Sequence, residues 1–251
     1  AEHDPKPVPM RKPEHDFKTD DYYIGDPHSN IIKKLHFQCG EQEILLESTS
    51  NDSLVVIGQT EYNVCPVCGY ASASESEIPK LHYNAYGYQC SNKEGKGKTY
   101  RLSHDFKTDV AKITFCTLEA NHLQVMLSVL YALLEGISKE LGIERTDIKG
   151  CLHKVIWNNN LIYSIILYDA VAGSAGHVRR IVTNDGDALR KGIASAIELT
   201  ENCDCDTSCY KCLRNYYNQK IHDQLNRNLA ARFLNKWTAQ LIPLEENLER
   251  T

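Results

Sequence analysis

The sequence lacks several features that would place it in large functional classes. No apolar run approaches the roughly 20 residues of a membrane span, and residues 1–16 are too polar for a secretion signal. Positive charge is not in excess: the formal net charge is −5 and the pI is near 6.1, which excludes a protein that coats DNA by charge alone. No Gly-x-x-x-x-Gly-Lys-Ser/Thr loop occurs, so this chain alone should not hydrolyse ATP. An initiating methionine is missing at Ala1, which is compatible with a fragment of a longer protein.

What the chain does have is enough apolar sequence for an ordinary core. It contains 251 residues, of which 42% are hydrophobic and 24% charged, a size that fits one large domain or two small ones. We divide it into an N-terminal tail with short strands (1–60), a zinc-knuckle insert (61–98) and a core with a four-cysteine site (99–251).

The order of the predicted elements indicates the fold class. Residues 122–141 carry leucines and isoleucines at helical spacing before Gly142 and predict a long, largely buried helix. Two later apolar runs joined at Asn158–Asn160 predict a β-hairpin. We therefore predict an α/β or α+β fold with a mixed sheet, the long buried helix, the hairpin and a zinc-pinned helical C-terminus. The other strands are expected at 31–37, 43–47, 54–58, 98–102 and 110–115, and the other helices at 177–182, 185–199 and 227–241.

Ten cysteines are present, and four of them fall within ten residues. Cys203, Cys205, Cys209 and Cys212 suit a tetrahedral Zn²⁺ ion, and four thiolates leave no position for water, so such a site is structural. Free thiols, two disulfides or an iron–sulfur cluster are the alternatives. Clustered cysteines without a secretion signal favour a metal and a cytoplasmic location.

A second possible zinc site begins at Cys65-Pro-Val-Cys68, a zinc-knuckle half-site in which Gly69 permits a tight turn. Cys90 is the third predicted ligand and His82 the fourth, with Cys39 as a weaker choice. The alternative is a knuckle that has lost its metal and persists through packing.

Several short motifs follow one another along the chain. Leu133-Leu134-Glu135-Gly136 lies in the long helix, and Leu167-Tyr168-Asp169 precedes a glycine loop at Gly173–Arg180. The cysteine quartet then continues into Leu213-Arg214-Asn215-Tyr216. Together these motifs resemble the MrfA zinc-binding (MZB) domain family.

The resemblance covers roughly residues 62–235 and implies an accessory domain at the C-terminus of a superfamily 2 helicase of the mitomycin-repair type, or of the helicase-like component of the DISARM phage-defence system. It implies that the four cysteines of the quartet bind zinc. Ser174 departs from the pattern where a second glycine is expected, which affects only the loop shape. Helicase motor domains, in the same chain or a partner, and DNA are the implied partners, and no membrane is.

Basic residues near the glycine loop and the quartet are candidates for nucleic-acid contact. His177, Arg179 and Arg180 stand at a predicted helix start, where backbone N–H groups favour an anion. Lys211 and Arg214 flank the quartet and could hold phosphate, with Tyr216 as a stacking face. Surface ion pairs with nearby acids are the alternative.

Two sets of residues raise the possibility of catalysis. Glu135, Asp147 and Asp169 could form a metal-dependent nuclease core, but pairing of Glu135 with an arginine and fixing of the glycine loop by Asp169 explain them better. His104 with Lys107 and Asp109 has the wrong spacing for a phosphodiesterase, and we expect a strand-entry turn there. We predict that the chain is not an enzyme; a nuclease-like domain, possibly degenerate, and a protein-interaction scaffold are the alternatives.

Overall fold

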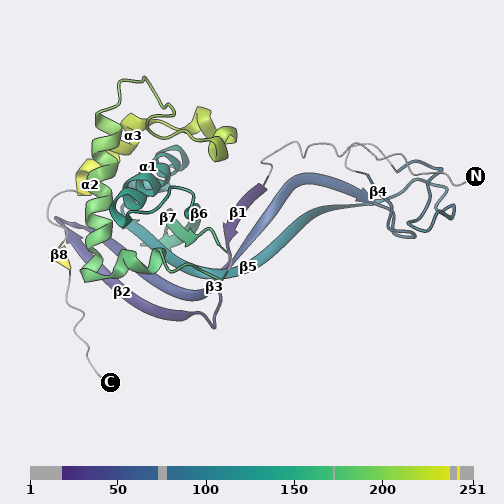
Figure 1. Ribbon diagram of the computed structural model, residues 1–251, viewed down its shortest axis with the longest axis horizontal. Coiled ribbons are helices and arrows are strands. Elements are labelled where there is room, and N and C mark those ends of the chain that lie inside the picture. Colours follow the sequence, from purple (N-terminus) through teal and green to yellow (C-terminus); the bar gives the residue numbers. More distant parts are fainter. Residues whose placement is uncertain (1–18, 73–77, 172, 238–241, 244–251) are drawn as a thin grey trace, which may run out of the picture. The chain divides into compact units, whose positions relative to one another are not determined.

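The computed structural model describes residues 19–72, 78–171, 173–237 and 242–243 (Figure 1). Residues 1–18, the first part of the expected N-terminal tail, lie outside the described residues. The chain divides into two compact units, here called the knuckle unit (Gly58–Tyr100) and the core unit (Asp20–Ile57 and the residues from Arg101 onward).

Eight strands and three α-helices make up the described chain, with short 3-10 helices in the connections. The strands are β1 (Thr19–Tyr23), β2 (Asn30–Cys39), β3 (Gln42–Val64), β4 (Ala71–Ser72), β5 (Lys98–Cys116), β6 (Ile148–Trp157), β7 (Asn160–Asp169) and β8 (Ile242–Pro243). The α-helices are α1 (Leu123–Leu141), α2 (Asp187–Glu201) and α3 (Arg227–Leu234). The 3-10 helices are Leu118–Asn121, Val178–Val182, Asn184–Gly186, Tyr216–Gln224 and Asn235–Trp237.

The strands form one sheet in the order β6-β7-β5-β3-β2-β8, and β1 and β4 also pair with β3. The pairs β2–β3, β2–β8, β3–β4, β5–β7 and β6–β7 are antiparallel. This sheet with its helices confirms the predicted α/β class.

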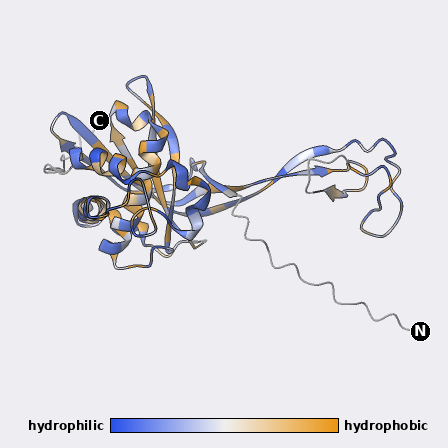
Figure 2. Cartoon of the chain, turned by 90° about the horizontal axis from the view of Figure 1, so that it is seen from above, coloured by the Kyte–Doolittle hydropathy of each residue, from blue (hydrophilic) through white to orange (hydrophobic). Residues whose placement is uncertain are grey.

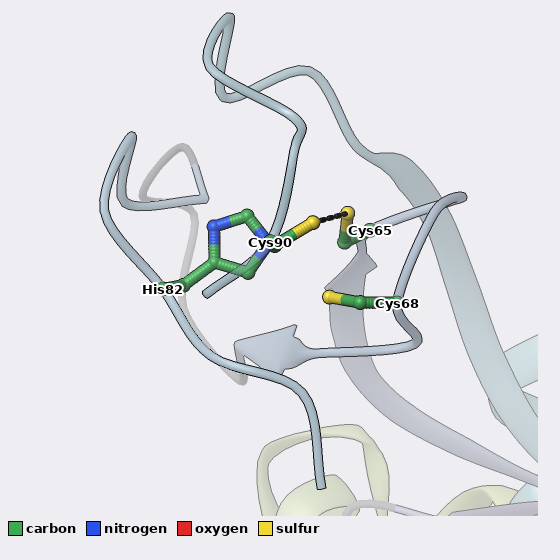
Figure 3. Close-up of side chains that lie close together, drawn as sticks. All are labelled: Cys65, Cys68, His82 and Cys90. Carbon is green, nitrogen blue, oxygen red and sulfur yellow. Dashed lines mark hydrogen bonds between the residues drawn. The ribbon is translucent and has the colours of Figure 1, made fainter. Parts of the chain in front are cut away.

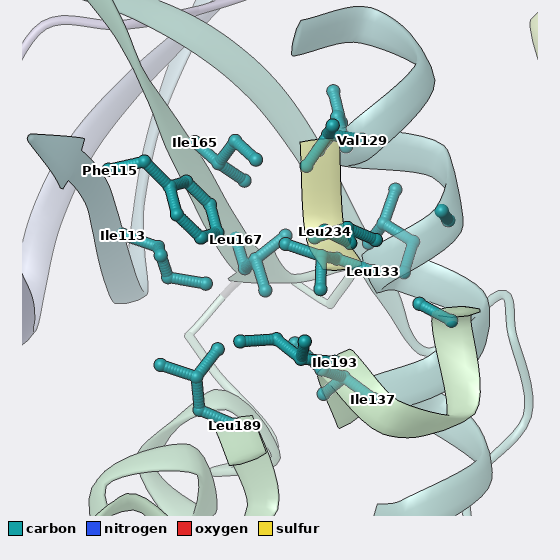
Figure 4. Close-up of a cluster of buried hydrophobic side chains, with 14 of the residues drawn as sticks. Ile113, Phe115, Val129, Leu133, Ile137, Ile165, Leu167, Leu189, Ile193 and Leu234 are labelled. Atoms are coloured by element: carbon teal, nitrogen blue, oxygen red, sulfur yellow. The ribbon is translucent and has the colours of Figure 1, made fainter. Parts of the chain in front are cut away.

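The main hydrophobic core lies in the core unit, where α1, α2 and α3 pack on one another and α1 packs on β6 and β7 (Figure 4). Phe115 of β5 and Leu167 of β7 face Leu133 of α1, and all three side chains are fully buried. Burying one such side chain stabilises the fold by roughly 1.5–3 kcal/mol. Figure 2 shows the hydrophobic residues of the core unit gathered between its helices and its strands. No helix among the described residues is long and apolar enough to cross a membrane.

The long helix and the hairpin are confirmed. α1 occupies Leu123–Leu141, and Gly142 ends it in the left-handed conformation with φ +65°. The β6–β7 hairpin turns at Asn158 and Asn159, which have φ values of +46° and +61°. Asparagine tolerates this region better than other non-glycine residues, which explains the turn.

Three predictions of element length were wrong. The runs at 43–47 and 54–58 belong to one strand, β3, and those at 98–102 and 110–115 belong to β5. Neither a turn nor a break occurs at His104. The last helix ends at Leu234 and not at Leu241, because the chain tightens into the 3-10 helix Asn235–Trp237, which buries Trp237 against Phe115 and Phe233.

Candidate metal centres

The cysteine quartet lies in the loop between α2 and the 3-10 helix Tyr216–Gln224. Its sulfur atoms all lie within 4.8 Å of one another, so the four residues can hold a metal ion. Cys203 Sγ is 3.5 Å from both Cys205 Sγ and Cys209 Sγ, and Cys212 Sγ is 3.7 Å from Cys205 Sγ and 3.9 Å from Cys209 Sγ. None of these distances is near the roughly 2.05 Å of a disulfide bond.

The sulfur spacing fits zinc. A tetrahedral Zn²⁺ with Zn–S bonds of about 2.3 Å places its sulfur atoms about 3.8 Å apart, close to the separations in the quartet. Four sulfur ligands complete the coordination sphere, so an ion held here would order the loop and would have no position for a reacting water.

Backbone N–H groups point at the quartet sulfurs. Lys211 N–H donates to Cys209 Sγ over 3.3 Å, and this bond, together with those to the other quartet thiols, lowers the pKa of Cys209 to about 7. Cys209 N–H in turn donates to Cys212 Sγ over 3.2 Å, but burial raises the pKa of Cys212 to about 12. N–H groups directed at sulfur stabilise the thiolate form that binds metal.

The quartet loop is fixed to the rest of the core unit by α3. Arg227 Nε donates to the carbonyl of Cys205 over 2.5 Å and Arg227 Nη1 to that of Thr200 over 2.9 Å. Asn226, which caps α3, receives a hydrogen bond at its side chain from Leu229 N–H and donates its own N–H to Ser128 Oγ of α1 over 2.9 Å. The loop is therefore hydrogen-bonded to α3, and α3 to α1.

The second group of possible ligands lies in the knuckle unit (Figure 3). Cys65, Cys68, His82 and Cys90 place one ligand atom each within 4.8 Å of the others, and Cys65 Sγ is 3.8 Å from Cys90 Sγ. Cys39 is not in this group: it lies in the core unit, where its sulfur contacts the carbonyl of Lys236 at 3.3 Å.

His82 supplies a direct test of whether a metal fits. Its side chain is buried, its Nδ1 lies 2.7 Å from the carbonyl of Pro79, and its Nε2 has no hydrogen-bond partner. A proton on Nδ1 satisfies that carbonyl and leaves the Nε2 lone pair free, which is the tautomer of a metal-bound histidine. A metal ion held by the knuckle group would give this buried nitrogen a partner.

Asn92 supports the knuckle group and was not singled out from the sequence. Its side chain donates to Cys65 Sγ over 3.3 Å, and its backbone N–H to Cys90 Sγ over 3.4 Å. Burial raises the pKa of Cys65, but the hydrogen bond from Asn92 and the N–H groups of Val67 and Cys68 outweigh it and bring the pKa to about 5. The sequence signal that could have identified Asn92 as a support of this group is its position two residues after Cys90.

The apolar cluster of the knuckle unit is small. Among the described residues it consists of buried Cys65, Ile78 and Cys90, with Cys68 and Tyr70 packed against them. Metal binding at the knuckle would therefore supply much of the stabilisation that this unit cannot obtain from apolar burial.

The predicted phosphate-binding residues have different surroundings. Arg179 is paired with Asp109, with Nη2 2.7 Å from Oδ1, and Arg180 donates to the carbonyl of Leu141 over 2.8 Å. His177 precedes a five-residue 3-10 helix. Lys211 is exposed, while Arg214 donates from Nε to Ser208 Oγ over 2.8 Å. Contact with nucleic acid stays a prediction for all five of these residues. It is weakened for Arg179 and Arg180, because Asp109 and the carbonyl of Leu141 already bind their guanidinium groups.

The carboxylates of the nuclease alternative each have a structural partner. Glu135 pairs with Arg145 at 3.1 Å. Asp147 Oδ2 accepts from Glu144 N–H over 2.9 Å. Asp169 accepts hydrogen bonds from N–H groups of the glycine loop, which confirms the prediction that Asp169 fixes this loop. Among the described residues these three form no metal-binding group.

The His104, Lys107 and Asp109 set is also separated by its partners. His104 is exposed and stacks on Phe106, Lys107 pairs with Asp26 at 2.7 Å, and Asp109 is buried against Arg179. Each of these three side chains therefore has a different partner.

A cleft of about 850 Å³ opens beside the quartet. It lies between the ends of α1 and α2 and the quartet loop, and Lys139, Tyr210 and Lys211 line it together with the acidic Glu135, Glu198 and Asp204. Tyr210 is 66% exposed and stands edge-on to His222. The cleft combines cationic, anionic and aromatic side chains, and sequence spacing gave no indication of it.

Comparison with known proteins bears on these centres. Druantia protein DruE of Escherichia coli (strain UMEA 4076-1) is 27% identical over 237 residues, which are 82% of this chain and 13% of that protein. The chain thus spans about an eighth of the length of this curated relative. The relative is a Druantia protein, so the predicted link to DISARM gains no support from it.

Two solved structures also resemble the chain. A crystal structure of the DUF1998 helicase MrfA bound to DNA has a TM-score of 0.48 at 12% identity and covers 88% of this chain and 26% of that one. A second, of MrfA bound to DNA and AMPPNP, has a TM-score of 0.37 at 11% identity and covers 87% and 22%.

A family model described as the MrfA Zn-binding domain matches residues 129–213. This segment contains most of α1, the β6–β7 hairpin, α2 and all four cysteines of the quartet, but not the knuckle group. Residues 129–213 are therefore similar to the MrfA Zn-binding domain family.

Proposed function

We propose that this chain is a zinc-stabilised accessory region of a DNA helicase-like protein in DNA repair or anti-phage defence, and that it contacts nucleic acid beside the cysteine quartet. The single observation that carries the proposal is the set of four sulfurs at zinc-like spacing inside the segment that matches the MrfA Zn-binding domain family. In this proposal the quartet cysteines and the knuckle group each hold one Zn²⁺, and the chain itself is not a catalyst.

The nucleic-acid contact is assigned to the exposed side of the quartet loop. Lys211 is exposed there and its backbone N–H donates to Cys209 Sγ, while the Arg214 guanidinium is held by Ser208, so both residues lie beside the metal site. Tyr210 adds an exposed ring that can stack on a base. Glu198 and Asp204, which also line the cleft, would repel phosphate from it and favour contact at the exposed Lys211 and Arg214.

The relatives favour a helicase context for this contact. The chain corresponds to 13% of the length of its Druantia relative, and the family that residues 129–213 match is named after MrfA, a DUF1998 helicase. Docking of motor domains, in the same chain or in a partner, is the other role that this loop could serve.

Binding of fluorescently labelled DNA, followed by anisotropy at several salt concentrations, tests the proposal. Lys211→Ala should weaken binding to all sequences and reduce the slope of log K against log salt by about 0.7–0.9, the value for one lost phosphate contact. Arg214→Ala should act similarly. Lys149→Ala, which removes an exposed lysine from β6, is the matched control and should leave the slope unchanged.

Zinc-loaded chain that binds no DNA at low salt would contradict the contact with nucleic acid. Equal salt slopes for Lys211→Ala, Arg214→Ala and the control would show that the nucleic-acid contact lies outside the quartet loop.

A further inference from the structure

The knuckle unit exposes three tyrosines on one short turn. Tyr83 is 52%, Tyr86 86% and Tyr88 72% exposed. Tyrosine rings normally bury much of their apolar surface, so three open rings within six residues indicate a surface that meets a partner.

The turn is held in one conformation by its own hydrogen bonds. The side chain of Asn84 accepts from Tyr86 N–H over 3.0 Å and from Tyr88 N–H over 2.9 Å. Asn84 N–H donates to the carbonyl of Tyr88 over 2.9 Å, and Gly87 has a φ of +83° that glycine adopts readily. The rings are therefore presented on an ordered backbone, which lowers the entropy cost of binding.

Both ends of the turn belong to the knuckle group. His82 and Cys90 flank the tyrosines, and Cys90 N–H donates to the carbonyl of His82 over 2.9 Å. Figure 3 shows the two side chains converging with Cys65 and Cys68. The tyrosine-bearing turn is thus anchored at the proposed metal site.

The charge of this segment differs from that of the whole chain. The chain has 33 acidic and 28 basic residues, yet the stretch from Lys80 to Lys93 contains these two lysines and no acidic residue. Exposed aromatic rings with lysines and without acids match an anionic partner that carries flat, unpaired rings, as single-stranded nucleic acid does.

We infer that the turn from His82 to Cys90, here called the tyrosine turn, binds single-stranded DNA or RNA by stacking bases on Tyr86 and Tyr88. The inference rests on the proposed function and adds a second contact to it, in the knuckle unit. Stacking is independent of base identity because every base has a π face, and duplex DNA hides those faces. The contact is therefore selective for unpaired strands and tolerant of sequence.

Anisotropy of labelled oligothymidylate with the zinc-loaded full chain tests the inference. Stacking contributes about 1–3 kcal/mol per base, so Tyr86→Ala and Tyr88→Ala should each weaken binding about five-fold or more. Tyr86→Phe keeps the ring and should bind like the wild type. Tyr22→Ala removes a comparably exposed tyrosine (48%) from β1 of the core unit and should also leave affinity unchanged.

A second measurement reports stacking directly. In Tyr86→Trp, indole fluorescence should be quenched by oligothymidylate and not by a blunt duplex. Unchanged affinity in Tyr86→Ala and Tyr88→Ala, together with weakened binding in Lys211→Ala, would overturn the inference while the proposed function stands. The tyrosine turn would then fit a protein partner. If the chain binds no oligonucleotide at all, both proposals fail.

Discussion

Gly136 of α1 lies against Gly192 of α2 so closely that a Cβ atom on Gly136 would be 2.2 Å from the carbonyl oxygen of Gly192. A Cβ atom on Gly192 would in turn be 2.5 Å from Cγ1 of Ile137. The two helices therefore touch through their backbones, and no side chain fits between them at this crossing.

Replacing Gly136 with alanine should force the helices apart. Overpacking of this kind costs about 1–3 kcal/mol, and each kcal/mol lowers the melting temperature of a chain this long by about 2–4 °C. Thermal unfolding followed by circular dichroism measures the shift. Lys139→Ala, three residues away on the same helix and 64% exposed at its side chain, should change stability by less than about 1 kcal/mol. Equal melting temperatures for the two variants would contradict the close helix crossing.

Asp169→Asn should destabilise the glycine loop. The buried carboxylate accepts from Gly176 N–H over 2.6 Å, from Ser174 Oγ over 2.5 Å and from Val178 N–H over 3.0 Å. The asparagine amide replaces one acceptor oxygen with an NH₂ donor, which faces these N–H and O–H donors. The unpaired donors should lower the free energy of unfolding by about 1–3 kcal/mol. Asp147→Asn, which affects one hydrogen bond from Glu144 N–H, should lower the melting temperature less.

The same pair of variants tests the nuclease alternative. If Asp169→Asn melted like the wild type but abolished a Mg²⁺-dependent cleavage of DNA, Asp169 would be catalytic. Loss of stability without any cleavage to lose supports its structural role.

The titration of His153 should be shifted toward acid. Burial and the positive charge of Lys112 both lower the pKa of His153 below its ordinary value of 6.5. The folded chain binds this proton less readily than the unfolded chain, so stability is present above pH 6.5 and is lost as the pH falls through the depressed folded pKa. An NMR titration of the imidazole Cε1–H should give a midpoint below 6.5. Lys112→Ala should raise the midpoint only in part, because burial is the larger cause; a midpoint at or above 6.5 in the wild type would contradict this.

Metal analysis should find two zinc ions per chain, one for each group of ligands. Cys212→Ser and Cys90→Ser should each remove one ion, whereas Cys116→Ala, which changes a buried thiol outside both groups, should remove none. The purified protein should be colourless. Visible absorption from iron and sulfide would replace zinc at the quartet with an iron–sulfur cluster.

Chelation should then expose the thiols of the two groups to alkylation before the other cysteines. Burial raises the pKa of Cys116 to about 11 and of Cys151 to about 12, so both remain protonated and unreactive near neutral pH. Peptide mass spectrometry after brief iodoacetamide treatment measures the order of modification. Early labelling of Cys116 or Cys151 would indicate that metal loss unfolds the whole chain.

Local signals were sufficient for the elements that depend on neighbouring residues. The apolar spacing of α1 with Gly142 after it, and the asparagines of the β6–β7 turn, predicted those elements because each is specified within a few residues. Cysteine spacing similarly predicted that the quartet would come together.

Long-range contacts explain what sequence reasoning missed. Separate strands were predicted at 43–47 and 54–58, but Asp52 between them is buried inside β3, where Tyr23 and Thr49 donate to its carboxylate over 2.9 and 2.7 Å. The partner of Arg179 is Asp109, 70 residues earlier in the chain. Such pairings depend on the tertiary fold, and one sequence contains no local pattern that reports them.

The hydrogen bonds from Arg227 to Cys205 and Thr200 make the quartet loop part of the same folding unit as α3. Zinc bound at the quartet, as proposed above, would therefore also stabilise the helical core, because a ligand that binds only the native state shifts the folding equilibrium by mass action. Above the dissociation constant, each tenfold rise in free zinc adds about 1.4 kcal/mol to the free energy of unfolding. The amount of this protein that survives in a cell should therefore follow the supply of zinc during its synthesis.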